Sequence, residues 1–449
     1  MTNDIFARSL VETIDGLAKK TFSKKELNSE YLARIEKLNP KLNAYLQVNP
    51  NSDQIPAAIK DLISVKGLKM TCASKILEDY SPVFNATVIE KLYKNQISVI
   101  GKTNLDEFAM GSSGENSAYG PTINPWNSTK ITGGSSSGSA AAVASDLCTF
   151  ALGTDTGGSI RQPASLCSVV GLKPSYGRVS RYGAQALASS LDQIGPITKT
   201  VEDARLVLNL ISGGDNYDSN AKKEGFSANS RLENLKGVKL GFDPQQFGQG
   251  IDKNVKLQIQ KAISQLEKLG AKMVEVNIEN SKYALASYYL ILASEVSANL
   301  ARYDGLRFGK NRDFFGDEAK RRIMLGTFAL SSGYFDDYYI KAAKVRTLIC
   351  ADFNKAYKSC DAIVGPTSPT VAWDLGQKTN DPLTMYLSDI YTIPASLAGL
   401  PAISIPCGFA ENLPVGLQIV GKFMQEEAIL DIAQIFQDAT NHHLKKPNV

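Results

Sequence analysis

Apolar positions recur at helical spacing in several parts of the chain. In 254–269 they return every three or four residues and define one face, which is typical of an amphipathic helix. The segment 23–38 shows the same spacing. Ser23 and Glu26 fit a capping box at its start, and Pro40 is expected to end it. Further helices are predicted at 84–95, 138–146, 283–301, 317–325, 334–358 and 425–438.

Short apolar runs alternate with these helices and predict strands. The run IPAAIKD at 55–61 is unusual because it carries Lys60 inside an otherwise apolar segment. Alternation of strands and helices favours an α/β fold with a parallel or mixed sheet. Other strands are predicted at 97–100, 148–152, 238–242, 271–276, 362–364, 402–405 and 416–420.

These elements predict one large α/β domain over 1–449, whose mixed central β-sheet is covered by helices on both faces. Within it we expect an N-terminal helical segment at 1–54, a first half at 55–212 and a second half at 236–449. The polar stretch 213–235 would then be a long surface loop between the two halves.

Histidine is nearly absent, and this limits the chemistry. The chain of 449 residues holds only two, His442 and His443, both close to its end. A Ser-His-Asp triad needs imidazole as its base, and most zinc hydrolases need His ligands. Either mechanism would have to recruit the C-terminal tail. An enzyme of this composition is therefore expected to use Lys, Asp, Glu or Tyr as its base.

The charge and the cysteines indicate a protein of the reducing cytoplasm. There are 49 Lys and Arg against 45 Asp and Glu, and a net charge of +4 does not favour a nucleic-acid or membrane surface as partner. The six cysteines are scattered without a CxxC pair, so neither a zinc cage nor a disulfide framework is indicated. We see no signal peptide and no stretch apolar enough to span a membrane.

Two glycine-serine elements lie close together, TGGSSSGS at 132–139 and GTDTGGSIRQ at 153–162. One interpretation without a functional role is that they are two flexible turns. Alternatively, their backbone N–H groups converge on an anion. A phosphate loop does not fit, because Gly101-Lys102-Thr103 lacks the glycine five residues earlier. The pattern GxSxG fits a nucleophile elbow around Ser136, but the elbow needs a histidine.

The remaining option is a serine activated by a lysine. A lysine serves as base only when it is neutral, and burial can lower its pKa by several units. Lys60 is the best candidate because of its apolar strand. Local sequence alone equally allows a lysine that reaches to the solvent or forms a salt bridge.

The lysine strand and the two glycine-serine elements, at these spacings, resemble the amidase signature family of serine amidohydrolases. The resemblance implies a Ser–cis-Ser–Lys triad. Ser159 would be the nucleophile, Ser135 the bridging serine after a cis peptide from Gly134, and Lys60 the base. The oxyanion hole would be formed by backbone N–H groups of Ser159 and of three preceding residues, Thr156, Gly157 and Gly158.

Within the family, the chain is most similar to the A subunits of tRNA-dependent amidotransferases. The similarity includes NLDEFAMGSSGENSAYGPTINPW and MYLSDIYTIPASLAGLPAISIPCGF. It implies a glutaminase that supplies ammonia for amidating Glu-tRNA(Gln), with Asp-tRNA(Asn) as a second candidate substrate. Arg322 would bind the α-carboxylate of glutamine and Asp389 its α-ammonium group, with Tyr288 a further contact. The alternative roles are a solvated helix face for Arg322 and a helix N-terminus for Asp389.

The same resemblance implies no cofactor in this chain. ATP and Mg²⁺ would be used by a partner, the B subunit, which would also make most of the tRNA contacts, and a C subunit would complete the assembly. Two other hypotheses remain open from the sequence. One is a standalone amidase acting on small amides, and the other is an inactive scaffold that only binds partners.

Overall fold

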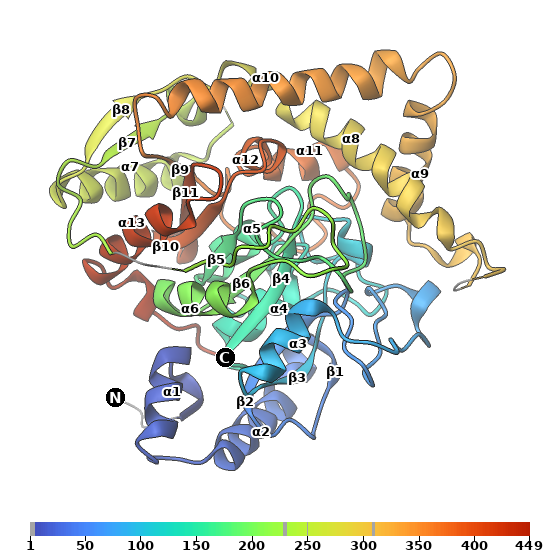
Figure 1. Cartoon of the computed structure of the whole chain (residues 1–449), viewed down its shortest axis with the longest axis vertical. Helices are drawn as coiled ribbons and strands as arrows, with labels where there is room; N and C mark the ends of the chain where they lie inside the picture. Colours follow the sequence, from blue (N-terminus) through green and yellow to red (C-terminus); the bar gives the residue numbers. More distant parts are fainter. Residues whose placement is uncertain (1–4, 228–230, 249, 308–309) are drawn as a thin grey trace.

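The computed structural model describes residues 5–227, 231–248, 250–307 and 310–449, and these contain one large mixed β-sheet (Figure 1). Its strand order is β1-β3-β2-β4-β6-β5-β10-β11-β9-β7-β8. β2 runs parallel to β3 and β4, whereas β10 runs antiparallel to β5 and β11. The strands are β1 (Tyr45–Val48), β2 (Ile55–Lys60), β3 (Ile97–Thr103), β4 (Phe150–Asp155), β5 (Val170–Lys173), β6 (Gln193–Thr198), β7 (Lys239–Phe242), β8 (Lys272–Glu275), β9 (Ala362–Pro366), β10 (Ala402–Ala410) and β11 (Leu413–Gly421).

Helices surround this sheet, and the predicted α/β fold is confirmed. The buried side chains form two large clusters, and β2 contributes to both: Ala57 and Ile59 belong to one, and Ala58 to the other. Because successive side chains of a strand point to opposite faces, both faces of β2 are covered. The α-helices are α1 (Leu10–Ala18), α2 (Lys24–Leu42), α3 (Thr87–Lys94), α4 (Ser137–Ala144), α5 (Arg161–Cys167), α6 (Val201–Ile211), α7 (Lys253–Lys268), α8 (Ala284–Asn299), α9 (Asp317–Ala329), α10 (Lys341–Ala356), α11 (Pro382–Tyr386), α12 (Ile393–Leu397) and α13 (Glu426–Asp438).

The two predicted halves meet at one pair of strands. β5 from the first half pairs with β10 from the second, and no other strand pair in the described sheet joins them. The described part of 213–235 contains neither a helix nor a strand, as predicted. The boundaries proposed for the halves stay a prediction. The segment 1–54 is not purely helical, because it also contributes strand β1 at the sheet edge.

The prediction that Pro40 ends its helix is wrong. The capping box of Ser23 and Glu26 is present at the start of α2, but the helix continues through Pro40 to Leu42. A proline removes one backbone donor and disturbs the preceding turn, but here tertiary packing compensates, because Leu42 is buried in the core. The helix ends instead at Asn43, whose φ of 50° is left-handed.

Helices α8, α9 and α10 pack together: α10 runs along the top of Figure 1, and α8 and α9 lie at its upper right. Helix α8 packs against α9, α10 and α12. The small residue Gly326 lets α9 approach α8 closely, since a Cβ at this position would lie 1.8 Å from the carbonyl oxygen of Ala293. This packing positions Tyr288 on α8 and Arg322 on α9.

Candidate active site

Lys60 is the last residue of β2, and its side chain is completely buried. It lies on the same face of the strand as Ala58, the face that α4 covers. Its Nζ lies 2.7 Å from Ser135 Oγ, 3.0 Å from Ser136 Oγ and 3.0 Å from Thr154 Oγ1. Among the described residues, no carboxylate forms an ion pair with it. Burial without a directly contacting anion lowers the pKa of Lys60 to about 7.

The turn before α4 brings the serines to this lysine. The Gly134-Ser135 peptide bond is cis, as expected. Glycine is required at position 134, because a Cβ there would lie 2.0 Å from an oxygen of the buried carboxylate of Asp106. Ser136 is also completely buried, and its Oγ interacts with the backbone of Thr154. These contacts hold Ser136 in the interior beside β4, which does not suit the role of elbow nucleophile.

Ser159 belongs to the glycine-rich loop between β4 and α5. The backbone N–H of Ser136 donates to the carbonyl oxygen of Ser159 at 3.1 Å, so the two glycine-serine elements lie against each other. Ser159 is partly exposed, whereas Lys60 and Ser135 are buried. In the described part of the chain, no backbone carbonyl accepts a hydrogen bond from the N–H groups of 156–159. These donors remain available for the oxyanion that the sequence predicts there.

The side chains of Tyr288 and Thr392 pack against this loop and leave no room for a side chain at positions 157 and 158. A Cβ on Gly157 would lie 2.4 Å from the hydroxyl of Tyr288, and a Cβ on Gly158 would lie 2.3 Å from Thr392 Oγ1. Gly158 also has a φ of 148°, which side-chain-bearing residues rarely adopt. Thr392 Oγ1 donates to the carbonyl oxygen of Gly157 at 2.6 Å. The loop is therefore held by elements from the second half of the chain.

A buried ion pair anchors both ends of the loop, and the sequence did not predict it. Arg161 donates to the two carboxylate oxygens of Asp155 at 2.9 Å each, and both side chains are fully buried. The guanidinium also donates to the carbonyl oxygen of Thr392 and to Gln418. Burial alone would raise the pKa of Asp155, but the adjacent Arg161 outweighs it and holds that pKa below its usual value. The sequence did contain a signal for this ion pair, because the motif GTDTGGSIRQ holds both of its charged residues.

Replacing Arg161 with methionine is expected to destabilise the protein by about 3–5 kcal/mol, because the Asp155 carboxylate would stay buried without its partner. Chemical denaturation of the purified protein measures the change. Arg231→Met is the matched control, since Arg231 pairs with Glu202 at the surface and its loss should have little effect. Equal stability of the two variants would contradict a structural role for the buried pair.

The residues predicted to bind glutamine lie beside this loop. Arg322 is buried, its Nε donates to Glu318 at 2.7 Å, and its guanidinium lies over the rings of Tyr289 and Tyr386. Burial lowers the pKa of Arg322, but the Glu318 carboxylate outweighs it and raises that pKa. The solvated helix face that we considered for Arg322 is therefore wrong.

Asp389 is also buried, and Ser112 donates a hydrogen bond to its carboxylate. Burial raises the pKa of Asp389 to about 7, against the opposing effects of Ser112 and Arg322. Its main-chain carbonyl accepts from the N–H of Thr392 at 3.1 Å, which connects Asp389 to the glycine-rich loop. Tyr288 is buried at the same loop, and burial raises the pKa of its hydroxyl. The structure thus gathers the three predicted residues around one region.

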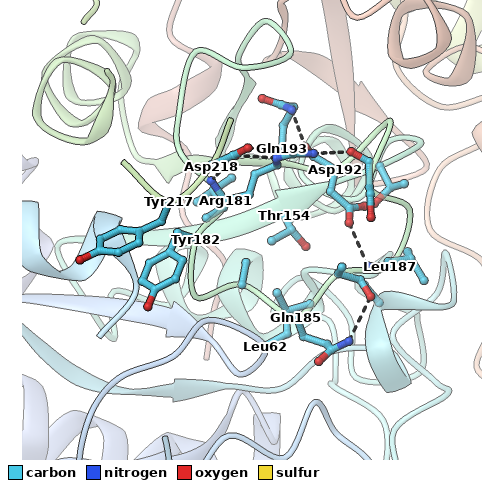
Figure 2. Close-up of a pocket in the computed structure, with 16 residues that line it drawn as sticks. Leu62, Thr154, Arg181, Tyr182, Gln185, Leu187, Asp192, Gln193, Tyr217 and Asp218 are labelled. Atoms are coloured by element: carbon cyan, nitrogen blue, oxygen red, sulfur yellow. Dashed lines mark hydrogen bonds and ion pairs between the residues drawn. The ribbon is translucent and has the colours of Figure 1, made fainter. Parts of the chain in front are cut away.

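A cavity of about 210 Å³ lies next to the residues that contact Lys60 (Figure 2). Thr154, whose hydroxyl contacts Lys60, lies in the middle of the lining, between Asp192 and Leu62. On one side Tyr182 stacks on Tyr217 with ring centroids 4.3 Å apart. None of the three predicted glutamine-binding residues lines this cavity. It borders Thr154 beside Lys60 and Thr156 at the start of the glycine-rich loop.

The arrangement suits hydrolysis of an amide by a serine with lysine as its base. A lysine of near-neutral pKa contacts the hydroxyls of Ser135 and Ser136. Ser159 is partly exposed, and the N–H groups of its loop have no backbone acceptor among the described residues. The amidase family model matches residues 26–430, and the chain belongs to this family. No group of three or more His, Cys, Asp or Glu side chains suited to a metal ion occurs in the described ranges.

Particular relatives narrow this assignment. The chain is 51% identical to the A subunit of glutamyl-tRNA(Gln) amidotransferase of Caldanaerobacter subterraneus subsp. tengcongensis, over 97% of both chains. The crystal structure of the A subunit of glutamyl-tRNA(Gln) amidotransferase from Thermotoga maritima superposes with a TM-score of 0.89, at 43% identity and over 100% of both chains. A peptide amidase structure matches with a TM-score of 0.84 at 27% identity, over 100% of this chain and 99% of the other.

Proposed function

We propose that this chain is the glutaminase component, the A subunit, of a glutamyl-tRNA(Gln) amidotransferase. In this proposal Ser159 attacks the side-chain amide carbon of glutamine. Its proton passes to Ser135 and from Ser135 to the neutral amine of Lys60. The proton then returns to the leaving nitrogen, ammonia departs, and water hydrolyses the γ-glutamyl ester on Ser159 by the same relay.

The contact between Lys60 and Ser135 carries this proposal. At 2.7 Å the two groups are within range for direct proton transfer, and the lysine has an environment that favours its neutral form. A buried lysine with a carboxylate in contact would stay charged and could not accept the proton. The backbone N–H groups of Thr156, Gly157, Gly158 and Ser159 are proposed to stabilise the oxyanion that forms on the amide.

Substrate choice is proposed to depend on two charges. Free glutamine carries an α-carboxylate and an α-ammonium group, which a simple amide lacks. Arg322 can hold the carboxylate, with Tyr288 beside it, and Asp389 can hold the ammonium group. The sequence similarity to the A subunits of amidotransferases over almost the whole chain supports glutamine over small amides.

The ammonia is proposed to serve a second protein of the assembly. By similarity to the named relatives, the B and C subunits of the amidotransferase are the expected partners, and the product would be Gln-tRNA(Gln). ATP and Mg²⁺ would act on the partner, which would also hold most of the tRNA, while this chain needs no cofactor. We place the assembly in the cytoplasm. None of the described helices combines the length and the apolar content that crossing a membrane requires.

Replacing Asp389 with asparagine tests this function against a standalone amidase. The KM for glutamine is expected to rise by about 10- to 100-fold, because a charge-assisted hydrogen bond to the ammonium group is lost. The rate with a simple aliphatic amide should hardly change. In the wild type, the KM for glutamine should also rise as the pH falls below about 7, since Asp389 then becomes protonated. Steady-state assays of ammonia release provide both values.

Asp381→Asn is the matched control, since Asp381 is exposed eight residues earlier and only caps α11. It should leave both substrates unaffected. Unchanged glutamine kinetics in Asp389→Asn, together with rapid turnover of other amides, would favour the standalone amidase.

A further inference from the structure

Another buried carboxylate, that of Asp106, lies at the turn that carries Ser135, and the proposed reaction does not use it. Asp106 is completely buried in the loop after β3. Its backbone N–H donates to the carbonyl oxygen of Ser135 at 3.3 Å. Its side chain fills the space that a Cβ on Gly134 would occupy. Asp106 therefore contacts the Gly134-Ser135 turn through both its backbone and its side chain.

The same carboxylate shapes the loop that reaches the proposed glutamine site. Its two oxygens accept hydrogen bonds from the backbone N–H groups of Gly114 at 3.0 Å and Asn116 at 2.9 Å. Just before these anchors lies Ser112, whose hydroxyl donates to Asp389 and whose carbonyl oxygen accepts from Gln162. One side chain thus joins the serine turn to the residue proposed to bind the ammonium group.

Among the neighbouring charges, Asp106 acts most strongly on the pKa of Lys60. Burial lowers the pKa of Lys60, and the charges that oppose this are Asp106 first, then Asp155 and Asp192, with the buried thiol of Cys72 a smaller contribution. Asp155 is neutralised by its arginine, and Asp192 accepts from Thr156 and from two backbone N–H groups. The hydrogen bonds described for the Asp106 carboxylate come from backbone donors.

Asp106 itself faces few charges. Burial raises its pKa to about 6, its two backbone donors and Lys60 oppose this, and Glu115 adds to it. At neutral pH the carboxylate is therefore mostly ionised and acts on Lys60 as a negative charge without direct contact.

We propose that Asp106 is a positioning residue that couples the proton relay to glutamine recognition. Its carboxylate holds Ser112 against Asp389 while its charge keeps Lys60 from losing its proton affinity altogether. The assignment rests on the proposed function. Asp106 touches neither substrate nor reacting atoms and acts through Ser135, Ser112 and the field at Lys60.

Asp106→Asn tests the assignment in the chain purified with the proteins that assemble with it. The amide keeps the shape but loses the charge and one of the two loop acceptors. We expect kcat/KM for glutamine to fall about 10- to 100-fold, the size that a displaced reactive geometry causes. With a simple aliphatic amide, which does not need Asp389, the acid limb of the kcat/KM profile should move to lower pH, because Lys60 loses the charge that raises its pKa. The KM should rise more for glutamine than for a simple aliphatic amide.

Asp203→Asn is the matched control. Asp203 is an equally buried carboxylate, and its oxygen accepts from the backbone N–H of Val11, in contact with α1 rather than the serines. This variant should leave the acid limb in place. A folded Asp106→Asn variant with an unchanged acid limb and equal effects on both substrates would overturn the proposal.

If Asp106→Asn does not fold, Ser112→Ala takes its place. It should raise the KM for glutamine without moving the acid limb measured with the aliphatic amide, and an unchanged KM would overturn the coupling. Failure of the proposed function gives a different result, because the wild-type assembly would then not release ammonia from glutamine. In that case the acid limb of Asp106→Asn, measured with the aliphatic amide, still decides the role of Asp106.

Discussion

Replacing Ser159 with alanine is expected to lower the rate of glutamine hydrolysis by about 10⁴- to 10⁶-fold, the range seen when a serine hydrolase loses its nucleophile. Alanine removes the only atom that can form the ester, while Lys60 and Ser135 keep their contact. Ammonia release measures the loss of activity. Mass spectrometry after reaction with an acylating amide analogue should show an adduct on the wild type and none on the variant.

Ser145→Ala is the matched control for this substitution. Ser145 is buried at the end of α4, and its hydroxyl has no partner among the described residues, so its removal should cost nothing. If Ser159→Ala kept activity close to that of the wild type, a different nucleophile would be needed. If the active wild-type assembly gave no adduct, the inactive-scaffold hypothesis would gain support.

Loss of the lysine base should have the second largest effect. Lys60→Met is expected to reduce kcat by about 10²- to 10⁴-fold, because a positioned general base contributes about that much. Lys60→Arg should be equally inactive, since a guanidinium keeps its proton at any working pH. In the wild type, activity should fall as the pH drops below about 7, where Lys60 becomes protonated. The pH dependence of kcat/KM with a simple aliphatic amide, which does not need Asp389, measures this limb.

Lys173 offers a matched control for the buried lysine. It is also buried, burial lowers its pKa to about 7, and its Nζ donates to the carbonyl oxygen of Pro174. Since the hydrogen bond described for its Nζ does not involve a serine, Lys173→Met should keep most of the activity and the same acid limb. A Lys60→Arg variant that works as well as the wild type would exclude proton transfer to this side chain.

Local signals predicted the long elements well. The amphipathic helix expected at 254–269 is α7, and the strand carrying Lys60 is β2. The strands β5 and β6 escaped prediction. β5 has only four residues, a glycine interrupts each of the two strands, and every residue of both is buried. Their apolar pattern has no alternation, so only their neighbours define them.

The candidate site likewise has parts that local sequence indicated and parts that only the fold revealed. The glycine-serine motifs indicated sharply turning backbone, because such turns need glycine whatever surrounds them. The roles of Ser135 and Ser159 came from the resemblance to the amidase signature family. The motif GTDTGGSIRQ shows the charges of Asp155 and Arg161, but no local pattern indicated the further contacts of Arg161 or any contact of Asp106. Their contacts join segments far apart in the sequence, such as Arg161 with Gln418.

The sequence by itself determined which groups can react, since histidine is almost absent and the serines and lysine stand in a recognisable order. Only the tertiary structure decided the state of those groups. Whether Lys60 is charged depends on how completely it is removed from water and on where the nearest carboxylates lie. Whether Arg322 and Asp389 face the same site depends on the packing of α9 and of the segment before α12. Both are properties of neighbours in space, which the order of residues along the chain does not contain.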